Sequence, residues 1–545
     1  MKVIYTTDIH GCLFPYDFIH GTEATVSLSQ IASLVKEERR KHPDEVVLLD
    51  GGDTLQGQPA CYLSNFAEPN RPNLAARAFN YLGYDAVCIG NHDIETGHAV
   101  YDKWRNEMNA PVMAANIIDQ TTHKPYFKPY TIIERQGKRI AILALTTTGV
   151  PYWLGEKLWH GMEFSEPVEC ARHWIKVLRQ KEKPDIIIGM FHSGWQGGIN
   201  AGANIENFTR TIAEQVDGFA LILFGHDHKA HCETVRNNSG KDVLCVNPSS
   251  NAYFVAVVDI NTEGTMSIEA RLVDVSTLPV DKDFTATFHD DFQQVKTFTE
   301  TEIGYAPATI FSRDSCFGPS PLCSLIHRVQ LQVSGADISF AAPLCFDETF
   351  RQGAIRIRDI FKLYQNENTI CSLRMSGREI KDFLEMSYDL WVQTMQNADD
   401  HIMLVNHTSY MGREYVFFKN LVFNFESASG IAYTVNVTKR HGNRIAITSL
   451  DNGRPFSMQA TYTVAMHSYR ASGGTEFLTK GAGIPHEELP KRKVFESKHD
   501  QRFHLIKYIK ENPSAFTLKE INWRFIPEDI TTQALLRDKR LLFGE

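Results

Sequence analysis

The sequence has no long hydrophobic run: its longest apolar stretches are about the length of Phe219–Phe224. A helix that crosses a bilayer needs roughly 18 or more consecutive apolar residues, so no membrane span is predicted. The first predicted strand, Lys2–Thr6, follows Met1 directly, with no charged and apolar leader before it. We therefore expect a cytoplasmic protein, or a periplasmic one if a leader has been removed.

Paired cysteines and basic clusters are also scarce. The ten cysteines include no Cys-x-x-Cys pair, and Cys88 and Cys245 fall in apolar stretches that favour buried thiols. Such usage suits a reducing compartment. The net charge is −9 and basic residues gather only in short clusters such as Lys491–Lys493, whereas proteins that bind nucleic-acid polymers carry a basic patch or stripe. We exclude such a polymer as partner, but a small anionic substrate fits if metal ions supply positive charge.

The patterning of the chain predicts two regions joined by a connector. At roughly 150 residues per domain, a chain of 545 residues is expected to hold more than one domain. Up to about residue 260, short apolar stretches alternate with amphipathic segments such as Leu28–Glu38, which indicates parallel strands covered by helices on both faces. We predict the α/β class: a layered α/β-β-α domain over 1–280, a connecting helix or hinge over 281–309, and a smaller α+β domain over 310–545. In the last of these, Val422–Asn424 is predicted to be a strand.

Five apolar strands in the first region each end in a polar cluster. The clusters are Asp8-Ile9-His10, Gly51-Gly52-Asp53, Gly90-Asn91-His92, His192 and Gly225-His226-Asp227-His228. In open α/β sheets, ligands bind outside the carboxyl ends of the strands, so the clusters are expected to converge at one edge.

The residue types in these clusters point to a metal centre. Carboxylate and imidazole ligands suit Mn²⁺, Zn²⁺ or Fe²⁺, and an Asp can bridge two metal ions ~3.5–4 Å apart. Glycines before the ligands let the backbone turn sharply. A lone His after a strand is usually structural, which is the interpretation we give to His42, His98, His160, His173 and His289. Five ordered clusters are poorly explained by chance.

The order of these motifs resembles the calcineurin-like metallophosphoesterase superfamily over roughly residues 1–260. The resemblance implies a metallophosphoesterase catalytic domain with two divalent metal ions, Mn, Zn or Fe. It implies one ion held by Asp8, His10, Asp53 and His228, and another held by Asp53, Asn91, His192 and His226, with Asp53 as the bridge.

Motifs in the second region are similar to the C-terminal domain of the 5′-nucleotidase family. They cover residues 363–370, 375–384 and 467–474. With both halves in this order, the chain resembles the 5′-nucleotidase and 2′,3′-cyclic-nucleotide 2′-phosphodiesterase family. The resemblance implies that 310–545 is a substrate-specificity domain that stacks the base of a small-molecule nucleotide between aromatic rings.

Details of these motifs favour the branch that hydrolyses 2′,3′-cyclic nucleotides and 3′-nucleotides. The Asn-Gly-Gly-x-Arg stretch typical of 5′-nucleotidases is absent, and Thr475 stands where they have an acidic residue. The stacking aromatic of the first motif falls at Asn366, with Tyr364 nearby as a substitute. The candidate substrate-binding residues are Tyr364, Asn368, Tyr469, Arg470, Gly473 and Gly474. The alternative is that the two tyrosines belong to the core and that Arg470 is solvated.

The predicted mechanism is attack of a metal-bound hydroxide on phosphorus, which requires no Ser or Cys nucleophile. His92 is the candidate catalytic residue that stabilises the developing charge or protonates the leaving alkoxide. Glu95 is expected to orient His92, with Asp93 as the alternative.

Three other functions stay open. The first is a 5′-nucleotidase that releases phosphate from nucleoside 5′-monophosphates. The second is a non-catalytic nucleotide-binding protein on the same scaffold, which the complete ligand set disfavours. The third is a protein or phospholipid phosphatase, which would leave the C-terminal motifs without a purpose.

Overall fold

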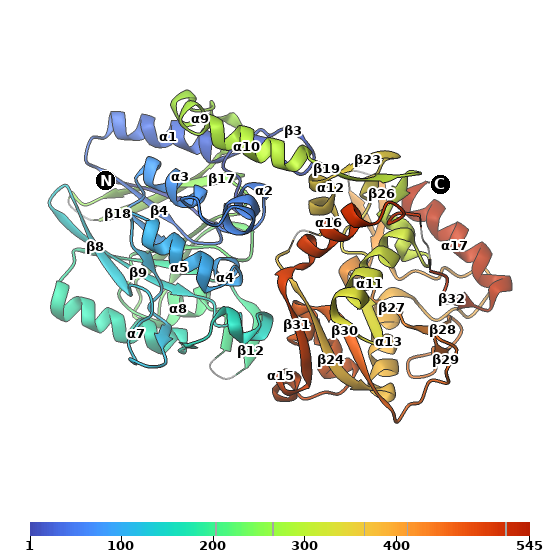
Figure 1. Cartoon of the computed structure of the whole chain (residues 1–545). Helices are drawn as coiled ribbons and strands as arrows, with labels where there is room; N and C mark the ends of the chain where they lie inside the picture. The colour runs from blue at the N-terminus through green and yellow to red at the C-terminus, as the bar shows by residue number, and fades with distance from the viewer. Residues whose placement is uncertain (202–203, 264–265, 365, 411–412, 518–519, 545) are drawn as a thin grey trace. The chain divides into compact units, whose positions relative to one another are not determined.

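A computed structural model of the chain describes residues 1–201, 204–263, 266–364, 366–410, 413–517 and 520–544. The chain forms two compact units, Met1–Thr299 and Glu300–Glu545, drawn from blue to green and from yellow to red in Figure 1. The segment predicted as a connector, 281–309, contains two helices and a strand: α9 (Lys282–Thr287), α10 (His289–Glu300) and β19 (Glu302–Ala306).

Two six-stranded sheets form the centre of the first unit. The first has the order β18-β17-β1-β4-β5-β6, and the second has the order β15-β16-β14-β11-β9-β8. In the first sheet the parallel strands are β1 (Lys2–Thr6), β4 (Val46–Asp50), β5 (Ala86–Cys88) and β6 (Val112–Met113), and the antiparallel ones are β17 (Phe254–Asn261) and β18 (Ser267–Asp274). In the second the parallel strands are β9 (Lys138–Thr146), β11 (Ile186–His192), β14 (Leu221–Phe224) and β16 (Asp242–Pro248), and the antiparallel ones are β8 (Tyr130–Arg135) and β15 (Ala230–Arg236).

The two sheets share one apolar layer, and helices cover their outer faces. Val3 and Val47 of the first sheet belong to the same buried cluster as Ile142 and Ile188 of the second. Outside the first sheet lie α1 (Leu28–Lys41), α3 (Leu74–Leu82) and α5 (His98–Glu107), and outside the second lie α7 (Pro167–Val177) and α8 (Thr209–Gln215). Strands buried on both faces need near-continuous apolar sequence, and β11 and β14 are buried at every residue. The predicted layered α/β architecture is confirmed.

The second unit contains a five-stranded and a three-stranded sheet. The orders are β27-β21-β30-β24-β31 and β29-β28-β32. The strands of the larger sheet are β21 (Ile338–Ala341), β24 (Thr369–Ser376), β27 (Ser427–Ser429), β30 (Thr461–His467) and β31 (Lys493–Asp500), and those of the smaller are β28 (Ile431–Asn436), β29 (Ile445–Leu450) and β32 (Trp523–Ile526). The longest helices of this unit are α11 (Pro321–Ser334), α13 (Gly377–Trp391), α16 (Gln501–Glu511) and α17 (Glu528–Phe543).

The predicted strand Val422–Asn424 is wrong, because this segment is a 3₁₀ turn. Its amide groups bond locally, from Asn424 to the Leu421 carbonyl and from Phe425 to the Val422 carbonyl. The buried Phe425 ring then stacks on Trp391, with ring centroids 5.2 Å apart.

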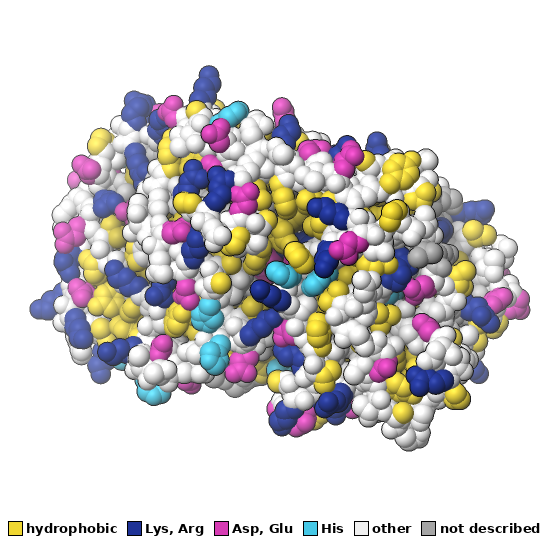
Figure 2. Space-filling view, in the orientation of Figure 1, with side chains coloured by type: hydrophobic (Ala, Val, Ile, Leu, Met, Phe, Trp, Pro, Cys, Tyr) yellow, Lys and Arg dark blue, Asp and Glu magenta, His cyan; other side chains and the backbone are white. Residues whose placement is uncertain are grey.

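The distribution of surface charge and the lengths of the helices are those expected from the composition. On the face in Figure 2, basic and acidic side chains are interspersed rather than gathered in a basic stripe. Among the described residues, no helix is both long enough and apolar enough to span a bilayer.

Candidate metal centre

The predicted polar clusters follow the carboxyl ends of β1, β4 and β5 in the first sheet and of β11 and β14 in the second. Their loops are hydrogen-bonded to one another. The amide of His10 donates to the Asp53 carbonyl over 3.0 Å, and the amide of His92 donates to Asp53 Oδ1 over 2.8 Å. The amide of His226 donates to Asp8 Oδ2 over 3.0 Å, so the two sheets are joined at this point.

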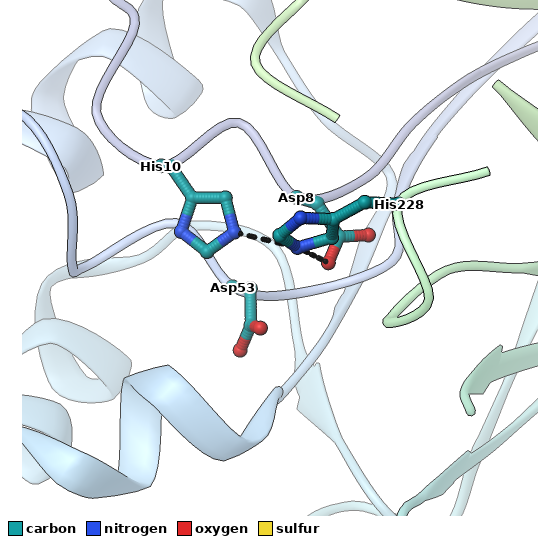
Figure 3. Close-up of side chains that lie close together, drawn as sticks. All are labelled: Asp8, His10, Asp53 and His228. Carbon is teal, nitrogen blue, oxygen red and sulfur yellow. Dashed lines mark hydrogen bonds and ion pairs between the residues drawn. The ribbon is translucent and has the colours of Figure 1, made fainter. Parts of the chain in front are cut away.

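Four of the predicted ligands form a first close set: Asp8, His10, Asp53 and His228 (Figure 3). Each offers one donor atom within 4.8 Å of the others. His10 Nε2 lies 3.1 Å from His228 Nε2, which lies 3.3 Å from Asp8 Oδ1.

Asp53 also belongs to a second close set, with His192 and His226. His192 Nε2 lies 3.1 Å from Asp53 Oδ2 and 3.1 Å from Asn91 Oδ1. The structure therefore brings all seven predicted ligands to one place, with Asp53 shared between the two sets.

The donor atoms fit divalent metal ions. Asp53 is fully buried, and its Oδ2 faces Nε2 of His192, another predicted ligand. The Nδ1 atoms of His10 and His192 lie 3.1 and 2.8 Å from the carbonyls of Gln56 and Gly51. Donation from Nδ1–H to a carbonyl orients each ring and directs Nε2 into the cluster, as in metal-ligating histidines.

The charges of these groups depend on one another. Burial alone raises the pKa of the Asp53 carboxyl, but His192 and His92 beside it bring that pKa well below its usual range. Burial lowers the pKa of His192, yet Asp53 raises it to about 9. Burial lowers the pKa of His10 to about 4. A dication that binds Nε2 of His192 therefore displaces a proton, as metal binding to imidazole does in general.

Five of the clustered residues have a left-handed backbone. The φ angles are 51° at Asp8, 47° at His10, 57° at Asp53, 75° at His226 and 57° at His228. Residues other than glycine rarely adopt such angles, and this strain concentrates at functional sites. The loops also leave no room for additional side-chain atoms, because a Cβ at Gly90 would overlap Asp53 Oδ1.

His92 lies beside the first set, and Glu95 holds its ring. His92 Nδ1 is 2.6 Å from Glu95 Oε2, and the His92 and His10 ring centroids are 5.6 Å apart. Asp93, the alternative partner, instead accepts the amides of Gly90, Asp53, Thr54 and Leu55. Asp93 therefore fixes the two ligand-bearing loops, a role that the sequence pattern did not indicate.

Two of the substrate residues predicted in the second unit, Asn368 and Tyr469, are hydrogen-bonded to each other. Asn368 Oδ1 accepts from Ser468 Oγ and from the Tyr469 amide, each over 3.2 Å. Tyr469 is partly exposed and lies parallel to His467, with ring centroids 6.1 Å apart. Gly474 makes room for that ring, because a Cβ there would lie 2.6 Å from it, and Gly473 has a φ of +98°.

Two other predicted substrate residues are buried. Tyr364 is only 2% exposed, and its neighbour Gln365 lies outside the described residues. Arg470 is fully buried: Nε donates to Glu426 Oε1 over 2.8 Å, and the other nitrogens donate to the carbonyls of Gly474 and Phe423. The guanidinium therefore holds its own loop instead of reaching a ligand or the solvent, which corrects the predicted direct contact.

The sequence motifs did not indicate one exposed aromatic side chain, which lies two residues after a backbone contact with Asn368. Phe503, near the start of α16, is 38% exposed and stacks on His499 with ring centroids 4.1 Å apart. The amide of Gln501, two residues before it, donates to the Asn368 carbonyl over 2.8 Å. Asn366, where the resemblance placed the first stacking aromatic, is exposed in the loop that carries Asn368. Phe503 lies far from the known motifs in sequence, so only its strand-end position after β31 could have indicated it.

Comparisons with known proteins find relatives of both halves of the chain. The family model of calcineurin-like phosphoesterases matches residues 1–230, and that of the 5′-nucleotidase C-terminal domain matches residues 297–480. A trifunctional nucleotide phosphoesterase protein of Bacillus subtilis is 24% identical over 97% of this chain, which spans only 39% of that relative. The 2′,3′-cyclic-nucleotide 2′-phosphodiesterase/3′-nucleotidase of Yersinia enterocolitica is 25% identical over 96% of this chain and 88% of its own length. A Staphylococcus aureus crystal structure assigned to the 5′-nucleotidases has the same fold, with a TM-score of 0.76, 21% identity, and coverage of 96% of this chain and 100% of that one.

Proposed function

The chain belongs to the 5′-nucleotidase family as a metal-dependent phosphoesterase, and from that premise we propose that it hydrolyses 2′,3′-cyclic nucleotides and 3′-nucleotides with two divalent metal ions. The observation that carries the proposal is the pair of close donor sets that share the buried Asp53. Because Asp53 belongs to both sets, two ions bound there would act on one phosphate group.

In the proposed reaction some residues hold the ions and others handle the proton of the leaving group. When bound, the ions lower the pKa of a coordinated water and offset the charge of the phosphate oxygens. Asp53, His10 and His192 are held rigidly by backbone contacts, so their donor atoms need little rearrangement. Glu95 accepts from Nδ1–H of His92, which leaves His92 Nε2 for the proposed proton transfer to the leaving alkoxide.

The choice of substrate rests on the C-terminal motifs and on the relatives. The absence of Asn-Gly-Gly-x-Arg disfavours 5′-monophosphates. The relative from Yersinia enterocolitica, which matches nearly the whole chain, is named for the cyclic and 3′ activities. The competing function is that of a 5′-nucleotidase, which the name of the matched C-terminal domain favours.

A substrate panel tests the choice between these activities. Phosphate release with Mn²⁺ or Zn²⁺ would be measured from 2′,3′-cyclic AMP, 3′-AMP and 5′-AMP, with bis-p-nitrophenyl phosphate to report diesterase activity. We expect kcat/KM to be higher for the cyclic and 3′ substrates. A higher kcat/KM for 5′-AMP would establish the 5′-nucleotidase function instead. If none of the four substrates is hydrolysed in the presence of metal, the proposal that the chain hydrolyses nucleotides is refuted.

Tyr469, whose amide donates to Asn368, is proposed to contact the base. Stacking of a base on an aromatic ring is worth ~1–3 kcal/mol, which is about 5- to 150-fold in affinity. Tyr469→Ala should weaken adenosine binding by this factor in calorimetry without metal. Tyr415→Ala, which removes an exposed tyrosine from β26 (Arg413–Phe418), is the control and should leave adenosine binding unchanged. Equal affinities for wild type and Tyr469→Ala would show that the base does not stack on this ring.

A further inference from the structure

A short hairpin between β11 and α8 brings an additional carboxylate to the metal centre. The hairpin consists of β12 (Gly197–Ala201) and β13 (Asn204–Asn207), and it carries Glu206. Glu206 lies in no motif that identifies the family from the sequence. It comes between His192 and His226 in the chain and reaches the second close set from the side of the hairpin.

The backbone around Glu206 is fixed by the loops that follow two strands of the second sheet. After β9, Thr147 Oγ1 donates to the Glu206 carbonyl over 3.0 Å, and Thr148 Oγ1 donates to the Ile205 carbonyl over 2.9 Å. After β11, Ser193 Oγ donates to the Glu206 carbonyl over 3.3 Å. The residue is therefore anchored to the end of β11, which carries His192, and to the end of its neighbour β9.

The two oxygens of the Glu206 carboxylate face different partners. Oε2 accepts from the Ile199 amide over 2.8 Å, and it packs where a Cβ on Gly198 would overlap it. Gly198 has a φ of +75°, so glycine suits this position for two reasons. Oε1 lies 3.4 Å from His226 Nε2, and the side chain is 21% exposed. One oxygen thus holds the carboxylate in place while the other is directed at the metal centre.

The two donor sets differ in charge. The first has a carboxylate of its own, Asp8, in addition to the shared Asp53. The second has only the shared Asp53, with the Asn91 amide and the imidazoles of His192 and His226. Two dications held around one shared carboxylate would repel each other, and the attraction of a fixed negative charge near the second set would offset part of that unfavourable energy.

We propose that Glu206 is a positioning residue that supplies the negative charge which the second set lacks and keeps His226 in place for the second ion. This inference rests on the proposed two-metal function. Glu206 is not a member of the close set of Asp53, His192 and His226, so it acts beside the ligands. Partners of this kind typically change metal affinity by 10–100-fold.

The test is Glu206→Gln, measured by calorimetric titration of the metal-free full-length protein with Mn²⁺. Gln keeps the size of the side chain and can still accept from the Ile199 amide, so the hairpin is retained. We expect two binding events in wild type, and in the variant a weakening of one event by about 10–100-fold while the other is unchanged. Glu163→Gln, an exposed Glu in β10 (Met162–Phe164), is the control and should match wild type.

The outcomes separate this inference from the proposed function. Wild-type affinities for both ions in Glu206→Gln, or equal weakening of both, would overturn the role of Glu206 even if the enzyme hydrolyses nucleotides. A single binding event in wild type would also overturn it. Loss of metal-dependent hydrolysis is not needed for any of these readouts, and failure of wild type to hydrolyse nucleotides would refute the proposed function by itself.

Discussion

Replacing Asp53 by alanine should lower kcat/KM for nucleotide hydrolysis by about 10³-fold or more. A bound metal ion is worth several kcal/mol of transition-state stabilisation, and each 1.36 kcal/mol is a factor of ten in rate. Asp53 lies in both close sets, so its loss is expected to weaken the binding of both ions at once. Its Oδ1 also accepts the His92 amide, so the turn that carries Asn91 and His92 loses a contact as well.

The measurement pairs phosphate release with metal content. After dialysis, Asp53→Ala is expected to retain less metal than wild type, and added Mn²⁺ should not restore the rate. Asp259→Ala, an exposed carboxylate on β17, provides the control and should keep both the rate and the metal. A variant of Asp53 that hydrolyses substrate at the wild-type rate would show that the shared carboxylate does not bridge two ions.

The convergence of the metal ligands could be predicted because it follows from topology. A parallel strand that is apolar at every position must be buried, and the residue after its carboxyl end then lies at the sheet edge where ligands bind. Asp8, Asp53 and Asn91 follow strands of one sheet, and His192 and His226 follow or end strands of the other. The strand pattern does not say to which of the two predicted β layers each ligand-bearing strand belongs, but the shared edge makes that distinction unimportant for the ligand list.

The contacts of Arg470 in the second unit and of Glu206 in the first could not be predicted, because they depend on tertiary structure and have no local sequence pattern. Arg470 follows Tyr469 in an exposed-looking loop motif, yet the buried Glu426, distant in sequence, fixes its guanidinium. Glu206 lies in a polar hairpin whose direction is set by the hydroxyls of Thr147 and Thr148. A polar side chain in a loop is usually solvated, and nothing in the sequence marks these two as exceptions.

The helix predicted for the connector between the two regions is a second case in which sequence pattern gave only part of the structure. Apolar residues at helical spacing predict one helix, but the structure has α9 and α10 with a break at Phe288. Phe284 and Phe288 are both buried against the first unit, and their ring centroids are 4.7 Å apart. Periodicity reports which side chains face the core, and it is insensitive to a short interruption that keeps both rings buried.

His92→Ala should lower kcat by about 10²- to 10⁴-fold, the usual contribution of a general acid or base, while the metal content stays at the wild-type value. The contact that matters for the metal centre is retained, because it is the backbone amide of residue 92 that donates to Asp53 Oδ1. Only the imidazole beside His10 is removed. A decrease in kcat with unchanged metal content and little change in KM would identify a group that acts in the transition state and not in binding.

The chain offers a closely matched control for this variant. His98 is 32% exposed and has Nδ1 3.0 Å from Asp102 Oδ2, much as His92 is 31% exposed and paired with Glu95. His98→Ala therefore removes a similar ion pair from α5, and its kcat should equal that of wild type. Glu95→Gln should lie between the two, because Gln can still accept from Nδ1–H but no longer stabilises a charged imidazole. If His92→Ala and His98→Ala have equal kcat values, proton transfer must be assigned to another group, and the orientation of His92 by Glu95 has no part in the chemistry.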